Sequence, residues 1–184
     1  MNALLTPSVA AKHIARGELI AYPTEALYGI GCDPNNASAL ASVLELKARD
    51  KNKGFIIIAA NFAQLTPFIQ PPTDLEKERL NAAWPGPVTY VVAAKPSLPS
   101  LLTGGRDTLA VRVSSHPVVR DLCVACGHAL VSTSANLSGT PGLTTASEVC
   151  KQFGKHLAGV VDGSLGNLKS ATPIYSLASG EKLR

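Results

Sequence analysis

Apolar and polar positions along this chain form two alternating patterns, short apolar runs and longer segments with helical spacing. The apolar runs have the length of strands that are buried on both faces, and they lie at residues 19–22, 55–60, 88–94, 109–113, 129–132 and 159–161. Helical spacing and capping residues predict helices at residues 8–16, 38–48, 74–83, 117–126 and 147–153. Residues 173–177 are a candidate edge strand.

Strands that alternate with helices in this way predict an α/β fold with a twisted, mixed β-sheet and flanking helices. A chain of 184 residues is long enough to bury a sizeable core, and we expect one domain over residues 4–184. Residues 96–107 are rich in Pro, Ser and Gly. We expect them to form a mobile loop with Gly104 and Gly105 as hinges.

The stretch from Pro23 to Gly31 is the most informative turn of the chain. An apolar run ends there in a segment that carries the Thr24 hydroxyl, the Glu25 carboxylate and two glycines. Glycine permits a close approach of the backbone that residues with a side chain resist. An ordinary strand-to-helix connection explains this turn as well as a ligand-binding loop does.

Composition places the chain among globular proteins, with 46% hydrophobic and 16% charged residues. The apolar runs are too short to cross a bilayer, and the first residues lack a basic region followed by an apolar block. We therefore expect a cytoplasmic protein without a secretory leader or membrane contact. The net charge of +4 is compatible with anionic ligands or nucleic acid.

Cysteine and histidine patterns argue against a metal site. The four cysteines are expected to be reduced, and Cys123 and Cys126 are expected to be buried on one helix face. The four histidines show no metal-ligand spacing, and His116 is expected at a helix entry. The phosphate-loop motif, a complete dinucleotide fingerprint and a Ser-His-Asp arrangement are missing from the sequence.

Polar residues gather instead in four clusters at the ends of predicted strands and helices. The clusters are Thr24 with Glu25 and Tyr28; Lys47, Arg49 and Lys53; Thr108 with Arg112; and the hydroxyl-rich segment 132–139, which includes Ser132, Ser134 and Asn136. Taken singly, each is explained by a solvated helix end, a cap or a turn. Together they predict a cleft for an anion, and a reaction driven by positioning and charge stabilisation.

Six motifs resemble, in order and spacing, the YrdC/TsaC family of threonylcarbamoyl-AMP synthases. They are Pro23-Thr24-Glu25, Tyr28-Gly29-Ile30-Gly31, Lys47-Ala48-Arg49, Trp84-Pro85-Gly86-Pro87-Val88-Thr89, Ala110-Val111-Arg112 and Ser134-Ala135-Asn136. The resemblance implies the short form of the family, with a basic concave face on its sheet. It implies synthesis of L-threonylcarbamoyladenylate and diphosphate from L-threonine, bicarbonate or CO2 and ATP, with Mg2+. Partner proteins would then modify adenosine 37 of tRNAs reading ANN codons.

The resemblance also implies residue roles. Threonine would be held by Thr24, Arg112, Ser132 and Thr172; ATP would be contacted by Arg49, Lys53, Thr108, Ser134, Asn136 and Arg184. Lys47 and Arg49 are the expected catalytic residues, and they would offset charge on the phosphates. Three positions depart from the family pattern: Asp50, Ser114 and Thr172. The roles of Glu25 and Tyr28 stay open.

Two other readings are compatible with the sequence. A basic concave face suits a non-catalytic factor that binds double-stranded RNA or ribosomal RNA during maturation. The few aromatic residues are not interleaved with the basic ones, which argues against recognition of single strands by stacking. The other reading is a carbamoyl-transfer module like the related domain of hydrogenase-maturation proteins.

Overall fold

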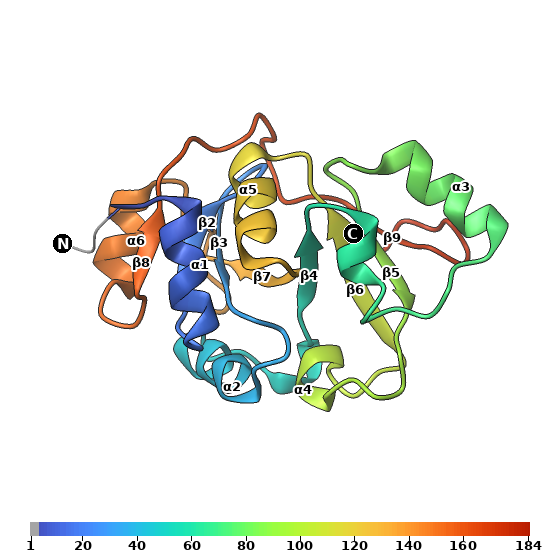
Figure 1. Ribbon diagram of the computed structural model, residues 1–184, viewed down its shortest axis with the longest axis horizontal. Coiled ribbons are helices and arrows are strands. Elements are labelled where there is room, and N and C mark those ends of the chain that lie inside the picture. Colours follow the sequence, from blue (N-terminus) through green and yellow to red (C-terminus); the bar gives the residue numbers. More distant parts are fainter. Residues whose placement is uncertain (1–3) are drawn as a thin grey trace.

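The computed structural model describes residues 4–184, and it contains one mixed sheet of nine strands in the order β1-β8-β2-β3-β7-β4-β6-β5-β9 (Figure 1). The strands are β1 Leu4–Leu5, β2 Ile20–Pro23, β3 Tyr28–Gly31, β4 Ile56–Ala59, β5 Thr89–Ala93, β6 Thr108–Val113, β7 Leu130–Ser134, β8 Gly159–Val161 and β9 Ile174–Ser176. The predicted α/β class with a mixed sheet is confirmed, and β9 is an edge strand as expected. Met1 to Ala3, part of the segment inspected for a leader, lie outside the described residues.

The helices are α1 Pro7–Ala15, α2 Ala37–Leu46, α3 Asp74–Ala83, α4 Ser100–Thr103, α5 Pro117–Cys126 and α6 Ala146–Phe153, with 3-10 turns η1 Lys51–Lys53 and η2 Phe62–Leu65. Helices α3 and α5 have the predicted bounds. Helices α3 and α6 begin with capping boxes, in which a threonine side chain and a glutamate side chain each bond the other residue's backbone N–H. None of the helices in the described part of the chain could cross a membrane.

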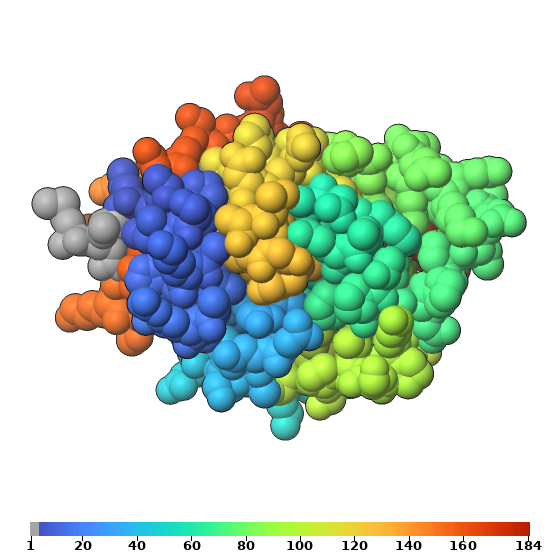
Figure 2. Space-filling model, viewed as in Figure 1, coloured from blue at the N-terminus to red at the C-terminus, as the bar shows by residue number. Residues whose placement is uncertain are grey.

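The sheet is covered on both faces because successive strand residues point in opposite directions. Ile20 and Ile58 pack in a cluster with residues of α1 and α5. Their neighbours Ala21 and Ile57 belong to the larger core that α2 and α6 help to close. In Figure 1, α1 and α5 lie in front of the sheet, and Figure 2 shows their side chains as a continuous surface with α2 below them.

The Pro23-to-Gly31 stretch is not one loop, and in this respect the prediction is wrong. Tyr28–Gly31 is strand β3, which pairs with β2 on one side and β7 on the other. Only the connection from Thr24 to Leu27 is a turn, closed by the Thr24 N–H bond to the Leu27 carbonyl (3.0 Å). Glycine is a poor strand former in isolation, so the local pattern concealed a central strand.

Gly31 is required in β3 by close backbone packing. A Cβ atom at this position would collide with the carbonyl oxygen of Val131 and would lie 2.8 Å from the ring of Tyr22. At Gly29 the nearest atom would be the Ser132 hydroxyl oxygen, at 3.3 Å. The two glycines therefore differ in the space that surrounds them, although they lie on the same strand.

We expect Gly31→Ala to reduce the free energy of unfolding by about 1–3 kcal/mol, because a methyl group must be forced into a closed space. Gly29→Ala is the matched control, and its loss is expected to be smaller because the two nearest atoms belong to side chains that are able to move, and the nearest backbone atom lies at the ordinary contact distance of 3.6 Å. Urea denaturation of the two variants and the parent protein measures the difference. Equal losses for both variants would contradict this account of Gly31.

Residues 96–107 contain a helix that the sequence did not predict. They contain α4, whose Leu102 and Thr103 side chains are buried. Gly104 ends this helix at a φ of 69°, a left-handed conformation that glycine adopts without strain. The backbone of α4 packs on Gly54, where a Cβ would lie 2.8 Å from the Thr103 carbonyl. A short packed helix therefore occupies the middle of the segment that was expected to be a loop.

Candidate active site

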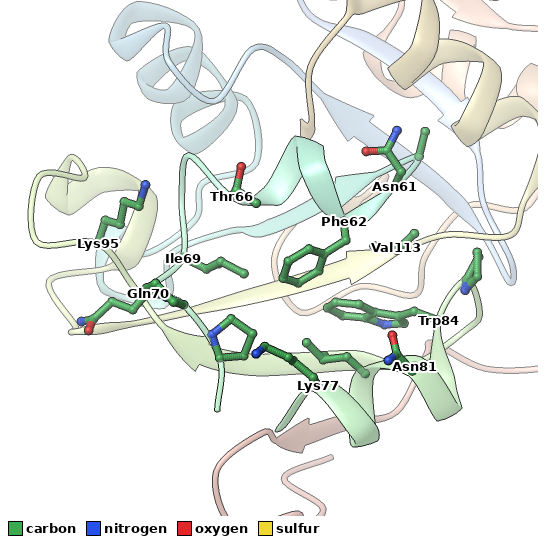
Figure 3. Close-up of a pocket in the computed structure, with 15 residues that line it drawn as sticks. Asn61, Phe62, Thr66, Ile69, Gln70, Lys77, Asn81, Trp84, Lys95 and Val113 are labelled. Carbon is green, nitrogen blue, oxygen red and sulfur yellow. The ribbon is translucent and has the colours of Figure 1, made fainter. Parts of the chain in front are cut away.

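At least three hollows lie on the described part of the chain, and two of them, which differ in character, concern the predicted residues and the face beside α3. The larger, of about 710 Å³, is mainly apolar and lies beside α3 (Figure 3). The smaller, of about 210 Å³, is where the polar residues predicted from the sequence come together. Catalysis requires several polar side chains that point toward one substrate. The smaller cavity has them, and it is therefore the candidate active site.

The cavity is built from the β2–β3 turn with the start of β3, the segment after α2, the neighbouring strands β4, β6 and β7, the segment after β7, and the C-terminal segment. Seven of the predicted site residues line it: Thr24, Arg49, Arg112, Ser132, Ser134, Thr172 and Arg184. Ser132 and Arg112 lie on one face of the sheet, because they stand opposite Ile56 and Ile58 of β4. Three arginines line the cavity and no Asp or Glu does, which makes its side-chain lining basic.

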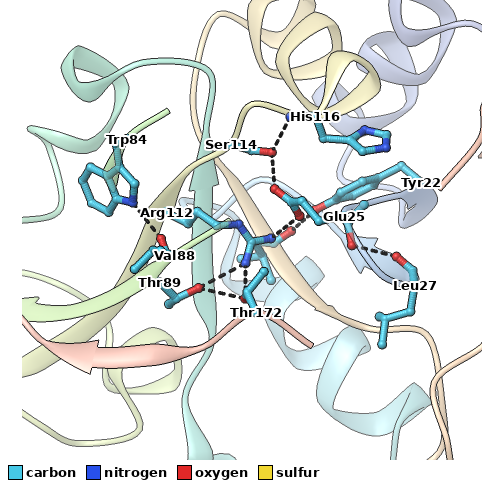
Figure 4. Close-up of polar contacts among 12 residues, drawn as sticks. Tyr22, Glu25, Leu27, Trp84, Val88, Thr89, Arg112, Ser114, His116 and Thr172 are labelled. Carbon is cyan, nitrogen blue, oxygen red and sulfur yellow. Dashed lines mark hydrogen bonds and ion pairs between the residues drawn. The ribbon is translucent and has the colours of Figure 1, made fainter. Parts of the chain in front are cut away.

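Arg112 is the most constrained of these residues, with only 5% of its surface exposed (Figure 4). One terminal nitrogen of its guanidinium donates to the hydroxyls of Thr172 (2.7 Å) and Thr89 (3.1 Å). The other lies 3.1 Å from the Glu25 carboxylate. Burial lowers the pKa of Arg112 while Glu25 raises it, and an arginine so placed stays charged.

Glu25 braces Arg112, which answers a question that the sequence left open. Its carboxylate is buried and also accepts a hydrogen bond from the Ser114 hydroxyl (2.6 Å). The Ser114 hydroxyl in turn accepts from the backbone N–H of His116 (3.0 Å), the residue before α5. Glu25 thus ties the β2–β3 turn to β6 and to the entry of α5.

Tyr28, whose role the sequence left open, and His116 both have structural partners. The Tyr28 hydroxyl donates to the carbonyl of Gly163 (3.2 Å). His116 is at a helix entry, as expected, and its ring Nε2 lies 3.1 Å from the Ser164 carbonyl. Burial lowers the pKa of His116, so its ring is neutral at neutral pH. Both side chains therefore hold the segment after β8 against the body of the fold.

Lys47 does not line the cavity. Its side chain is 2% exposed, and its ammonium donates to the backbone carbonyls of Ser134 and Asn136 and to the Asn136 side-chain oxygen (2.9 Å). Burial lowers the pKa of Lys47 to about 8, and Arg49 contributes to the shift. Through these three bonds, Lys47 fixes the end of β7 and the turn that follows it.

Arg49 is the member of the basic cluster that faces the cavity. Its guanidinium donates to the Gly54 carbonyl (2.9 Å) and lies 5.8 Å from the centre of the Phe55 ring. Lys53 is exposed on η1 and does not line the cavity. Burial lowers the pKa of Arg49, with the nearby Arg106 as a second cause.

Three other predicted residues lie at the edge of the cavity or outside it. Asn136 accepts from the Ser134 hydroxyl (2.5 Å) and organises the turn without lining the cavity. Thr108 is at the far end of β6 from Arg112. Arg184 lines the cavity and donates to the Thr172 backbone carbonyl (3.0 Å).

Sequence reasoning missed several residues of the site. Thr89 and Ser114 hold the Arg112–Glu25 pair, and Thr133 and Gly142 line the cavity. Thr89 is the last residue of a motif on which the family resemblance rests, and that motif could have identified Thr89 as a site residue. Gly142 had none, because its place depends on contact with the distant Leu27, whose side chain fills the space that a Cβ would take.

The donors present do not fit a metal centre made by the protein. No group of three or more His, Cys, Asp or Glu residues with metal-binding geometry occurs among residues 4–184. Glu25 is already engaged by Arg112 and Ser114. The cysteines that these residues include are free thiols, and burial raises the pKa of Cys32 to about 12 and that of Cys126 to about 11.

Known proteins resemble this chain over nearly its whole length. A threonylcarbamoyl-AMP synthase of Klebsiella pneumoniae is 47% identical over 184 residues, which cover 97% of this chain and 96% of the relative. One of Enterobacter is 50% identical over 169 residues, covering 91% of this chain and 88% of the relative. The crystal structure of P. abyssi Sua5 complexed with L-threonine has a TM-score of 0.88 at 30% identity, and it covers 94% of this chain and 51% of the larger Sua5 chain.

The family model for Sua5, YciO and YrdC, which is described as "Telomere recombination", matches residues 12–184. This match and the nearly full-length relatives cover the strands and turns that form the cavity. The chain therefore belongs to the Sua5/YciO/YrdC family.

Proposed function

We propose that this chain is a threonylcarbamoyl-AMP synthase that joins L-threonine, bicarbonate or CO2 and ATP. The observation that carries the proposal is the buried, pre-oriented Arg112 among the hydroxyls of Thr24, Ser132 and Thr172, in a cavity of about 210 Å³. A guanidinium is shaped to bind a carboxylate. Hydroxyl groups beside it suit the amine and hydroxyl of threonine.

The proposed reaction requires no nucleophile from the protein. The threonine amine attacks CO2 and loses a proton, which gives a carbamate. A carbamate oxygen then forms a bond to the α-phosphorus of ATP while the bond to the departing diphosphate breaks. Arg49 and Arg184 would offset the charge that develops on the phosphate oxygens, and they line the same cavity as Arg112.

The nucleotide extends beyond the cavity, which is smaller than the 300–1,000 Å³ of ordinary ligand pockets. Ser134 would contact it at the cavity wall. Lys53, Thr108 and Asn136 lie outside the lining, and we propose that they meet the parts of ATP that project from it. Mg2+ would arrive as part of the substrate MgATP, since no Asp or Glu lines the cavity to hold it.

Lys47 is proposed to position the nucleotide-binding turn, in place of direct contact with phosphate. We expect Lys47→Met to raise the KM for ATP about tenfold with a smaller change in kcat, because three oxygen atoms of the turn lose their donor. Hydrogen exchange of residues 136–140 should accelerate. Lys51→Met, on exposed η1, is the control. A loss of kcat alone with unchanged exchange would indicate phosphate contact.

The product would serve tRNA modification. We propose that partner proteins transfer the threonylcarbamoyl group to adenosine 37 of tRNAs reading ANN codons, and that the chain works in the cytoplasm. The basic cavity supports contact with an anionic substrate.

Incubation with ATP, L-threonine and radiolabelled bicarbonate tests the proposal. Labelled threonylcarbamoyl-AMP should form, together with one diphosphate per product, only when all three substrates are present. Absence of product in a folded preparation that binds double-stranded RNA would contradict the proposal and favour the RNA-binding reading. Leu75→Ala, which changes an exposed side chain of α3, is a variant that should retain full activity.

A further inference from the structure

The groove beside α3 has the size and lining of a ligand pocket. Its volume of about 710 Å³ falls within the ordinary range for such pockets. The Ile69, Leu80 and Val113 side chains line it, each no more than 3% exposed. Phe62 and Trp84 point into the hollow from different segments (Figure 3). An apolar group that entered would lie against buried aliphatic side chains and two aromatic rings.

The groove is separate from the proposed synthase site. The two hollows have no lining residue in common. Arg112 lines the active-site cavity and Val113 lines the groove, and these are successive residues of β6. Successive strand residues point to opposite faces, so the sheet itself separates the two hollows. A ligand of the groove would not compete with threonine for space.

The charged residues that line the groove are lysines. Lys77 and Lys95 line it, and none of its lining residues is Asp or Glu. The Lys95 ammonium has no hydrogen-bond or ion-pair partner in the part of the chain that the structure describes. Lys77 lies 2.8 Å from Asp74, but both side chains are exposed, and a pair of this kind is exchanged at little cost. Both ammonium groups are therefore available to an anion.

We propose that this groove is a second binding site, for an amphipathic organic anion. Its ligand would join an aromatic body, held between Phe62 and Trp84, to a carboxylate or sulfonate that pairs with Lys77 or Lys95. Aromatic rings bind well beside other aromatic rings, in edge-to-face or offset contact. An apolar cation is disfavoured because it would meet two positive charges without a lining carboxylate.

Trp84 makes this site directly observable because it is the single tryptophan of the chain. Its indole N–H donates to the Val88 carbonyl (2.7 Å), which fixes the ring at the groove wall. Intrinsic tryptophan fluorescence therefore comes from the wall of this groove alone, and the variants below decide whether a probe that accepts its energy is bound there.

The probe for the test is 8-anilinonaphthalene-1-sulfonate, an aromatic anion that accepts energy from tryptophan. We expect one probe to bind per chain, with energy transfer from Trp84, and to stay bound when ATP and L-threonine are saturating. The uncharged N-phenyl-1-naphthylamine should bind about tenfold more weakly or worse, because it lacks the group that pairs with lysine. Displacement by ATP and threonine, or equal affinity of the two probes, would overturn the proposal.

Two variant pairs locate the bound probe. The double variant Lys77→Met and Lys95→Met should weaken it about tenfold, whereas Lys12→Met with Lys151→Met, which removes two exposed lysines elsewhere, should not. Phe62→Ala should also weaken it, and Leu75→Ala should not, although both residues are exposed apolar side chains. Circular dichroism confirms that each variant is folded. Unchanged affinity in both groove variants would refute the site.

Discussion

Replacing Arg112 with alanine is expected to destabilise the fold by about 3–5 kcal/mol and to abolish threonine-dependent release of diphosphate. The stability loss follows from the Glu25 carboxylate, which is buried and would lose its ion-pair partner. The activity loss follows from the guanidinium that the proposed mechanism places on the substrate carboxylate. Urea denaturation and a diphosphate-release assay measure the two effects separately.

The double variant Arg112→Ala with Glu25→Ala distinguishes these two roles. Removal of both charges leaves no unpaired buried ion, so much of the lost stability should return. Activity should stay lost, because the group that binds the carboxylate is still missing. Recovery of activity along with stability would show that Arg112 has only a structural role.

Replacing Arg49 with alanine is expected to reduce kcat/KM for diphosphate release at least about 100-fold, provided threonine and bicarbonate are present. Arg49 is the cavity-lining residue of the basic cluster, and loss of one charge contact on a reacting phosphoryl group costs several kcal/mol of barrier. Arg49→Lys should retain part of the rate, because it keeps the charge and loses the planar geometry.

Two controls accompany this experiment. Arg120→Ala removes an exposed arginine from α5 and should leave the rate unchanged. The melting temperature of Arg49→Ala checks its bonds to the Gly54 carbonyl, which also stabilise the entry to β4. Turnover close to the parent rate in a folded Arg49→Ala variant would remove Arg49 from the proposed mechanism.

Arg112 and Arg49 line the same cavity but differ in how deeply their side chains are buried. Arg112 is enclosed by hydroxyls and a carboxylate, so its position is set before substrate arrives. Arg49 is only half-buried, and its bonds are to one backbone carbonyl. We therefore expect Arg112 variants to affect folding and binding together, and Arg49 variants to act mainly on the rate.

Local sequence patterns located most of the helices and strands. The bounds of α3 and α5 follow from their caps and flanking prolines, and apolar runs located most of the strands. Turn chemistry also singled out Thr24 and the segment after β7, because hydroxyl residues at strand ends stand out against apolar surroundings. These features depend on neighbours within a few positions, which the sequence displays directly.

Tertiary structure decided what depends on contacts between distant residues. Ser114 bonds to Glu25 across 89 positions, and no local pattern reveals this bond or the Glu25–Arg112 pair beside it. Strand β3 exists because its glycines fit between β2 and β7, although glycine locally disfavours a strand. The sequence predicts Lys47 as an exposed cation at a helix end, and the folded turn after β7 is what buries it. In each case the partner is remote in sequence, and the free energy comes from packing and desolvation that arise only when the chain is folded.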